Sequence, residues 1–315
     1  MTTHPTLPQL DADLFLADGG LETTLIFDDG LDLPDFAAFI LLDDEEGRAA
    51  VVRYFERYAE LAVRHGVGIV LETPTWRASG DWAARQGYGT DDLRRLNREA
   101  VTLVQDVRRR WATPTTPIVV SGCIGPRGDG YQAGEIMSVS EARSYHGLQA
   151  RVFAEAGVDL VTAITMTNGA EAQGIVEAAR AQGLPVVIAF TVETDGTLPS
   201  GEHLGEVIEA VDAATDAYPA YYMVNCAHPD HFADVLDSTA PWIGRIRGIR
   251  ANASRLSHAE LDEAEVLDRG DPEELGRLYR ALREVHPHLT VLGGCCGTDH
   301  HHIGAISAAC AVVPA

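Results

Sequence analysis

Three of the five cysteines stand in two short motifs whose residue types suit a metal ion. Cys226 follows Asn225, and Cys295 and Cys296 stand side by side behind two glycines. Three thiolates that converge on one point favour a soft or borderline cation, above all Zn²⁺, and they leave a fourth tetrahedral position open, as in a catalytic site. The spacing is not that of a zinc finger, so buried, unreactive thiols are the alternative interpretation.

Charge limits the chemistry of such a site. Three thiolate ligands overcompensate a divalent ion and make it a weak Lewis acid toward water or a carbonyl group. The ion can still take an incoming thiol, lower its pKa and keep it as a nucleophilic thiolate near neutral pH. Alkyl transfer to sulfur is therefore favoured. The alternatives are a zinc hydrolase, which would need a general base beside the metal, and a non-catalytic zinc or thiol-redox protein that uses Cys295 and Cys296.

The other cysteines and histidines have simpler interpretations. The three histidines at 300–302 are consecutive on a predicted helix, point in different directions and are expected at a solvated helix terminus. His228 and His231 share a helix face beside Cys226, so one of them is a candidate to support a metal ligand. Cys310 lies on a helix and is predicted to be a small buried residue.

The cysteine motifs lie at the ends of short apolar runs. Eight such runs, most of them apolar throughout, are typical of strands buried on both faces of a parallel sheet. They cover residues 14–18, 68–73, 118–122, 160–165, 186–191, 221–225, 246–251 and 290–293. Because active sites of parallel barrels lie at the carboxyl ends of the strands, we expect Cys226, Cys295 and Cys296 on one rim.

Amphipathic segments with a period near 3.6 residues separate these runs and predict helices. The segments cover residues 48–65, 91–111, 140–156, 170–182, 202–217, 229–236, 272–285 and 298–309. Ser140 is expected to cap one helix, and Gly66, Gly157 and Gly183 are placed where helices should end. The two glycines before the cysteine pair are expected to let the chain turn tightly.

This alternation indicates βαβ units with right-handed crossovers. Eight units in a chain of 315 residues favour an α/β fold, a (β/α)8 TIM barrel that forms a single domain over residues 1–315, with a longer excursion at 252–270. A doubly wound open sheet is the alternative, because the sequence does not show the order of the strands.

Composition excludes several kinds of partner. The formal net charge of −23 repels phosphate backbones and anionic lipid, so neither nucleic acid nor a membrane surface is expected to bind. No apolar run approaches the ~20 residues of a membrane helix, and the N-terminus shows no secretory signal. We expect a cytoplasmic protein with reduced cysteines, and the sequence is compatible with a homo-oligomer.

Five motifs make the chain similar to one known family. They are Ala17-Asp18-Gly19-Gly20-Leu21, Ser121-Gly122-Cys123-Ile124-Gly125-Pro126, Tyr145-His146, Asn225-Cys226 and Gly293-Gly294-Cys295-Cys296-Gly297-Thr298. With these motifs the sequence resembles the homocysteine S-methyltransferase family over nearly the whole chain, and Asn-Cys followed much later by Gly-Gly-Cys-Cys is highly specific for it. The resemblance implies a (β/α)8 barrel in which Cys226, Cys295 and Cys296 hold Zn²⁺ and a thiol, homocysteine in the family, takes the fourth position.

The resemblance also implies the reaction and further site residues. Donors in the family include S-methylmethionine, S-adenosylmethionine, betaine and methyl groups carried by a corrinoid or a folate. The chain shows no appended corrinoid or folate module, so we expect a free sulfonium or ammonium donor, with S-methylmethionine or S-adenosylmethionine preferred, in methionine biosynthesis. Asp18 matches a position near the amino group of the acceptor, and Asn252 matches an asparagine after the seventh strand. Asn225 is a further candidate for substrate binding.

The chain departs from the family pattern around the acceptor. A carboxylate that binds the acceptor's ammonium group usually follows the fourth strand, and Ile164 stands in its place. Glu22 replaces a small residue, Glu72 lies in a run that differs from the family pattern after the second strand, and Cys123 stands where serine is common. Either Glu72 or Glu22 has taken over recognition of the ammonium group, or the acceptor is a thiol other than homocysteine.

Trp76 is a candidate for binding a positively charged methyl donor. An aromatic face attracts a cation by ~0.5–2 kcal/mol without adding a hard counterion. Trp76 follows the second predicted strand, on the rim where the cysteines are expected. Packing of the indole beneath a loop is the alternative.

Overall fold

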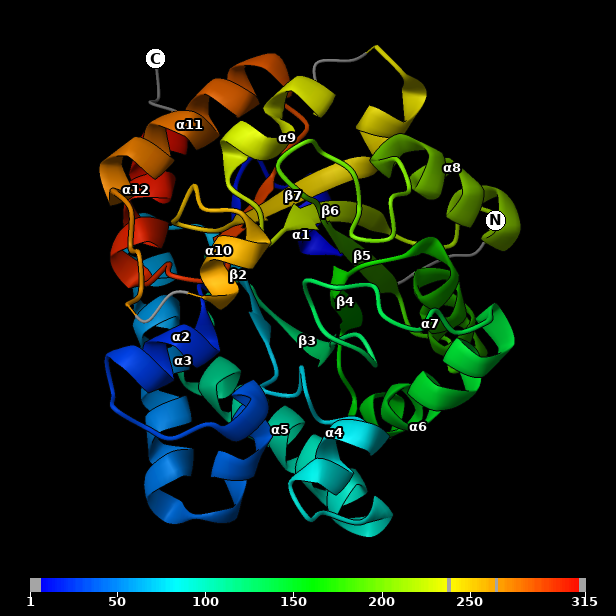
Figure 1. Ribbon diagram of the computed structural model, residues 1–315. Helices are drawn as coiled ribbons and strands as arrows, with labels where there is room; N and C mark the ends of the chain where they lie inside the picture. The colour runs from blue at the N-terminus through cyan, green and yellow to red at the C-terminus, as the bar shows by residue number, and fades with distance from the viewer. Residues whose placement is uncertain (1–6, 237–238, 264–265, 312–315) are drawn as a thin grey trace.

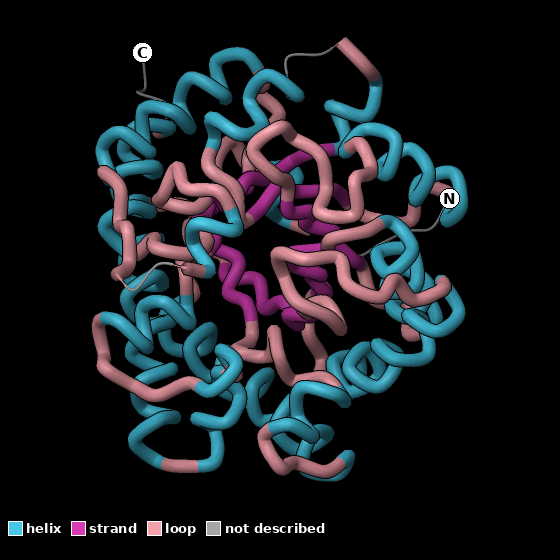
Figure 2. Tube along the Cα trace, viewed as in Figure 1, coloured by secondary structure: helices cyan, strands magenta, loops and turns pink. Residues whose placement is uncertain are grey.

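The fold is a closed barrel of parallel strands in a computed structural model that describes residues 7–236, 239–263 and 266–311. The strands are β1 (Phe15–Ala17), β2 (Gly68–Glu72), β3 (Ile118–Ile124), β4 (Leu160–Met166), β5 (Val186–Thr191), β6 (Tyr221–Asn225), β7 (Ile246–Ala251) and β8 (Val291–Gly294). They follow one another around the ring, and β1 pairs with both β2 and β8. Figure 2 shows the strands at the centre of the molecule. The predicted (β/α)8 barrel is confirmed, and the open sheet is excluded.

Helices cover the outside of the ring (Figure 1). The α-helices are α1 (Pro8–Asp11), α2 (Leu21–Phe27), α3 (Glu45–His65), α4 (Gly80–Arg85), α5 (Thr90–Trp111), α6 (Val139–Ala156), α7 (Gly169–Ala181), α8 (Leu204–Thr215), α9 (Pro229–Leu236), α10 (His258–Asp262), α11 (Pro272–Val285) and α12 (His300–Cys310), and the 3₁₀ helices are η1 (Pro34–Phe36), η2 (Ala38–Asp43) and η3 (Pro241–Arg245). All predicted helices are present. Four further helices were not predicted, because they are too short for a clear 3.6-residue period: α1, α2, α4 and α10. Among the described residues, no helix combines the length and apolar character that crossing a bilayer requires.

Helix ends follow local chemistry, with one error in the prediction. Gly66 and Gly157 end α3 and α6 with φ values of 67° and 77°, which confirms their predicted places. Ser138, and not Ser140, caps α6. The hydroxyl oxygen of Ser138 accepts the Glu141 N–H, and the Glu141 carboxylate accepts the Ser138 N–H at 2.8 Å. Ser140 lies inside the first turn, where its side chain cannot reach the same N–H groups.

Successive residues of each strand point into two separate apolar layers. On β5, Val187 and Ala189 belong to the cluster inside the barrel, whereas Ile188 and Phe190 belong to the layer beneath the helices. Leu7, beside α1, joins the inner cluster and closes the barrel at the amino ends of the strands. In Figure 1, α1 is seen behind the strands. A functional site is therefore expected at the opposite end of the barrel, where loops cross the opening of the ring (Figure 2).

Candidate metal centre and substrate cavity

The three predicted metal ligands meet at the carboxyl ends of β6 and β8. The N–H of Cys226 donates to the carbonyl of Arg250 at 3.1 Å, and the N–H of Cys295 donates to that of Ala251 at 2.9 Å. Both cysteine segments are thus fixed to β7, which lies between them. The Sγ atoms of Cys226, Cys295 and Cys296 lie within 4.8 Å of one another, close enough to hold one metal ion.

Every sulfur in this cluster accepts a hydrogen bond from a neighbouring side chain. The pairs are Tyr131 Oη to Cys296 Sγ (3.4 Å), Thr165 Oγ1 to Cys226 Sγ (3.7 Å) and Asn225 Nδ2 to Cys295 Sγ (3.9 Å). Hydrogen bonds to the charged form stabilise it, so in the reduced protein these contacts would favour thiolates, the form in which cysteine binds a metal. The donor set therefore fits a soft or borderline cation.

Asn225 holds a strained part of the backbone in place. Cys226 and Thr165 are non-glycine residues with φ values of 52° and 63°, a conformation that costs about 1–3 kcal/mol for each residue. The Thr165 N–H donates to Asn225 Oδ1 at 3.0 Å, and Asn225 Nδ2 donates to Thr165 Oγ1 at 2.9 Å. This reciprocal pair offsets the strain, and it places Asn225 beneath the cysteines rather than on the cavity surface.

Cys226 and Cys295 are joined as a disulfide in this structure, with Cα atoms 5.4 Å apart. Reduced cysteines were expected from the sequence, because a cytoplasmic protein was expected and its thiols stay reduced, so this disulfide differs from the prediction. A thiolate ligand is the reduced form, so the disulfide and metal binding are alternative states of the same two side chains.

An ionic cluster connects β1, β2 and β7 at the barrel mouth. Arg250 Nη2 donates to Asp18 Oδ1, Nη1 lies 3.4 Å from Glu72 Oε1, and Nε donates to the Gly294 carbonyl at 3.1 Å. All three charged side chains are at most 6% exposed. Burial raises the pKa of Glu72 to about 7, although the Arg250 guanidinium lowers it. Asp18 and Glu72, both predicted to bind substrate, are thus already paired with a cation. The sequence signal that could have identified Arg250 was its place near the carboxyl end of a predicted strand.

A cavity of about 340 Å³ opens at this end of the barrel. Five carboxylates and two guanidiniums line it: Asp18, Glu22, Glu72, Asp129 and Asp268, with Arg77 and Arg250. The cysteine cluster and Cys123 also reach it. Burial raises the pKa of Cys123 well above its usual value, so this thiol stays protonated. Three exposed apolar side chains reach the same cavity, namely Phe27 (46% exposed), Phe36 (48%) and Val266 (78%).

Trp76 lines the cavity, but a protein cation already covers one face of its ring. The guanidinium of Arg77 lies 3.9 Å from the centroid of Trp76 and 3.7 Å from that of Trp82. The indole N–H of Trp76 points to the Ile164 carbonyl at 3.4 Å. Only the remaining face or the edge of Trp76 can meet a ligand.

His258, on α10, is the histidine that supports the cysteine cluster. Its Nε2 lies 2.9 Å from the Cys226 carbonyl oxygen, its Nδ1 lies 3.1 Å from Glu193 Oε1, and the Tyr131 ring stacks on it at 4.1 Å. The loop after β3 and the excursion after β7 therefore meet above the cysteines. Neither Tyr131 nor His258 stands in a motif that predicted this role, because the role depends on how the two loops fold.

The histidines singled out in the sequence have other partners. Burial lowers the pKa of His228 to about 4, and its Nδ1 accepts the Asp230 N–H at 3.2 Å. His231 Nε2 lies 3.0 Å from the Arg255 carbonyl oxygen. The predicted solvated terminus is wrong for His302, which is 2% exposed and lies between a side chain and a carbonyl oxygen of the protein.

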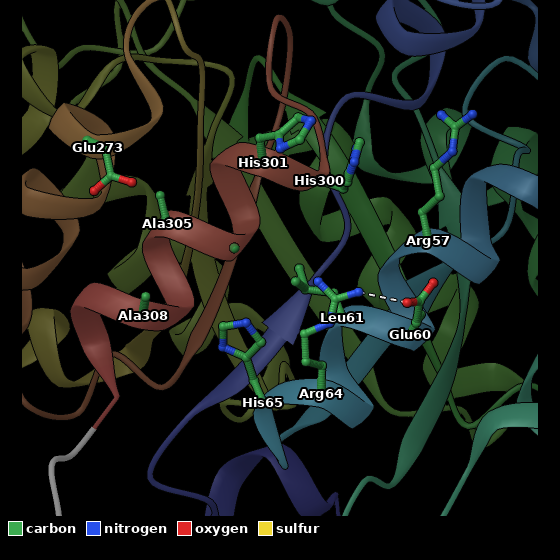
Figure 3. Close-up of a pocket in the computed structure, with 11 residues that line it drawn as sticks. Arg57, Glu60, Leu61, Arg64, His65, Glu273, His300, His301, Ala305 and Ala308 are labelled. Atoms are coloured by element: carbon green, nitrogen blue, oxygen red, sulfur yellow. Dashed lines mark hydrogen bonds and ion pairs between the residues drawn. The ribbon is translucent and has the colours of Figure 1, made fainter.

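A second cavity, of about 520 Å³, lies between α3 and α12 on the outer layer (Figure 3). His300 and His301 line it together with Arg57 and Arg64, and Arg64 pairs with Glu60 at 2.7 Å. Asp299, His300 and His301 also bring donor atoms within 4.8 Å of one another at the start of α12. These groups are on the helix layer and belong to a different surface from the cysteine centre.

Gly293 and Gly294 are needed for close packing rather than for the predicted tight turn. Both continue β8. A Cβ on Gly293 would lie 2.7 Å from the Cβ of Ala17, and one on Gly294 would overlap Thr298 Oγ1. The turn itself is made by Gly297, with φ 77°.

Asn252 lies behind the cysteine segment. It is 1% exposed, and its N–H donates to the Ala227 carbonyl at 3.1 Å. Within the described part of the chain, its Oδ1 has no hydrogen-bond partner and the cavity lining does not include it.

Comparison with known proteins agrees with this arrangement. The sequence model of the family described as homocysteine S-methyltransferase matches residues 15–310. Methionine synthase of Mycobacterium leprae (strain TN) is 26% identical over 280 residues, which are 82% of this chain and 21% of that protein, so the chain spans about a fifth of this relative.

Solved structures of the homocysteine methyltransferase MmuM from Escherichia coli share the fold. The oxidized form gives a TM-score of 0.77 at 19% identity, and the metallated form gives 0.72 at 20% identity. Each comparison covers 94% of this chain and 96% of the other. The chain belongs to the homocysteine S-methyltransferase family.

Proposed function

We propose that this protein is a zinc-dependent S-methyltransferase, which moves a methyl group from a sulfonium or ammonium donor to homocysteine or a related thiol. The observation that carries the proposal is the cluster of Cys226, Cys295 and Cys296, whose sulfurs lie within 4.8 Å and each accept a hydrogen bond. The metallated form of the Escherichia coli homocysteine methyltransferase supports a metal at such a site.

Residues of this chain would bind the metal and position its ligands. Cys226, Cys295 and Cys296 would bind zinc, and Tyr131, Thr165 and Asn225 would keep their sulfurs in the thiolate form. When bound, the ion supplies a positive charge that lowers the pKa of the acceptor thiol and favours its nucleophilic thiolate near neutral pH. The Tyr131–His258 stack contacts the cluster through Cys296 Sγ and the Cys226 carbonyl oxygen, and so helps to position these cysteines.

The cavity suits a cationic methyl donor. Its carboxylates outnumber its guanidiniums, so a sulfonium or ammonium compound is attracted and a phosphate compound is repelled. The acceptor sulfur attacks the methyl carbon as the donor's bond to that carbon breaks, and the donor leaves as a neutral thioether or amine. S-methylmethionine and S-adenosylmethionine are the preferred donors, and Trp76 is a proposed contact for the donor.

Asp18, Glu72, Asn225 and Asn252 remain predicted substrate-binding residues, each with the contacts given above. For the first two, binding would go through atoms that Arg250 leaves unused. A cytoplasmic location and a homo-oligomer are further parts of the proposal.

The disulfide favours one alternative, a thiol-redox protein, with Cys226 and Cys295 as the redox pair. A hydrolase is less favoured. The buried carboxylates of Asp18 and Glu72 are paired with Arg250 and are poor candidates for a general base.

The decisive experiment measures zinc content and thiol–donor turnover in anaerobically purified wild type, Cys226→Ala and Cys310→Ala. Cys310 is a buried cysteine on α12 and serves as the control. We expect about one zinc per chain in wild type and Cys310→Ala, and loss of both zinc and turnover in Cys226→Ala. Wild type without zinc, or turnover that survives Cys226→Ala, would contradict the proposal.

A further inference from the structure

One carboxylate in the cavity differs from the other four in its lack of a partner. Asp18 and Glu72 pair with Arg250. Asp129 accepts the Tyr131 N–H at 2.7 Å, and Asp268 accepts the Ser254 hydroxyl at 2.6 Å. Among the described residues, Glu22 has neither an ion pair nor a hydrogen bond from another residue, although it lines the same cavity.

The position of Glu22 makes this lack of a partner notable. It lies in the first turn of α2, four residues after Asp18, and is partly buried. Burial, and to a smaller extent the charge of Asp18, raises the pKa of Glu22 to about 7, although Arg77 and Arg250 lower it. A partly buried carboxylate without a counterion is destabilising, and a ligand cation would reduce that cost.

Two independent observations point to a ligand at this end of the cavity. Glu72 Oε2 has no hydrogen-bond partner among the described residues, and it belongs to a side chain about 94% buried in the cavity wall. Phe27, in the same helix as Glu22, and Phe36 are exposed apolar side chains at the same cavity. Exposed apolar side chains that line one cavity together with a buried polar atom that has no hydrogen bond are typical of a binding site.

We infer that Glu22 is the residue that binds an organic cation on one of the two substrates, either the ammonium group of an amino-acid thiol or the onium centre of the methyl donor. The inference rests on the proposed function. The uncharged part of that substrate would pack against Phe27 and Phe36. Glu22 thereby determines specificity rather than taking part in the chemical step.

The test compares wild type with Glu22→Gln, Glu22→Asp and the control Glu209→Gln, an exposed glutamate on α8. Steady-state kinetics are measured with S-methylmethionine as donor and with homocysteine or its desamino analogue, 4-mercaptobutanoate, as acceptor. A charge-assisted contact predicts a rise of about tenfold or more in one KM for Glu22→Gln, with kcat changed far less. Glu22→Asp should restore part of the loss, and Glu209→Gln should behave as wild type.

The two sources of the cation give different patterns. If Glu22 binds the acceptor's ammonium group, wild type prefers homocysteine over 4-mercaptobutanoate and Glu22→Gln loses that preference. If Glu22 binds the onium centre, the donor KM rises and the preference between acceptors is unchanged. Values of KM within twofold of wild type for both substrates would overturn the inference.

Binding measurements separate this inference from the proposed function. Calorimetric titrations of homocysteine and S-methylmethionine into anaerobic wild type and Glu22→Gln need no turnover. Weaker binding of one ligand by the variant supports the role of Glu22 even if methyl transfer is not observed. Equal binding by the two proteins, or no binding by either, overturns it.

Discussion

Asp18, directly after β1, and Arg250, near the end of β7, form a buried ion pair across 232 residues of sequence. Glu72 on β2 completes the cluster from the other side of Asp18. An arginine that holds two carboxylates together leaves them less able to serve as ligands for a substrate cation. The relationship therefore divides the acidic groups of the cavity into those that organise the barrel mouth and Glu22, which stays available.

Replacing Arg250 with methionine should destabilise the protein strongly. The change leaves Asp18 and Glu72 buried without their counterion, which costs about 3–5 kcal/mol in comparable sites. Urea denaturation should show this loss in the free energy of unfolding. The double variant Asp18→Asn with Arg250→Met should lose less than the sum of the single changes, because it removes one of the two carboxylates left without a counterion. A fall of less than about 1 kcal/mol in the free energy of unfolding of Arg250→Met would show that the ion pair contributes little to stability.

Glu22→Gln should change how stability depends on pH. Burial raises the pKa of Glu22 from 4.5 to about 7. Between these values the folded protein holds a proton that the unfolded chain has released, so the wild-type free energy of unfolding falls as the pH rises through this window. The free energy of unfolding of Glu22→Gln, minus that of wild type, should therefore be larger at pH 8 than at pH 4.5.

Urea titrations of wild type and Glu22→Gln at pH 4.5, 6 and 8 check this expectation. Glu209→Gln, on the exposed face of α8, should show no such trend. Parallel stability curves for wild type and Glu22→Gln would mean that Glu22 titrates at its ordinary pKa in the folded protein.

Asn225→Ala should weaken metal binding by about 10–100-fold, the usual effect of losing a group that orients a ligand. The change removes the pair with Thr165 and the hydrogen bond to Cys295 Sγ. Competition with a chromophoric chelator measures zinc affinity under reducing conditions.

Asn97→Ala is a matched control for Asn225→Ala. Asn97 is also fully buried, but its amide donates to the carbonyls of Ala78 and Leu93, away from the cysteines. It should lower stability and leave zinc affinity unchanged. Equal loss of affinity in both variants would indicate general destabilisation.

Oxidation should remove the metal by consuming two of its ligands. Cys226 and Cys295 are the pair expected to form the disulfide, and peptide mapping by mass spectrometry should find it after mild oxidation. Zinc content and turnover should fall in parallel and return after reduction with added zinc. Cys123 should resist alkylation throughout, because burial raises its pKa. Full zinc content in the oxidised protein would refute the assignment of these two ligands.

Local patterns in the chain favoured the barrel and predicted that the three cysteines meet on one rim. Apolar runs and helical periods are properties of consecutive residues, so β5, β6 and β7 were predicted at their observed bounds. Once the strands are parallel, their carboxyl ends must share one rim. Cys226 and Cys295 were therefore expected together before any contact was known, and the motifs around them pointed to the family.

The contacts around the cysteine cluster and in the cavity could not be predicted from the sequence. The pairing of Arg250 with Asp18, the Tyr131–His258 stack and the isolation of Glu22 depend on loops and strands far apart in the chain. A single sequence carries no local period or motif for such contacts, because their energy comes from which side chains the closed barrel brings within a few ångströms of one another.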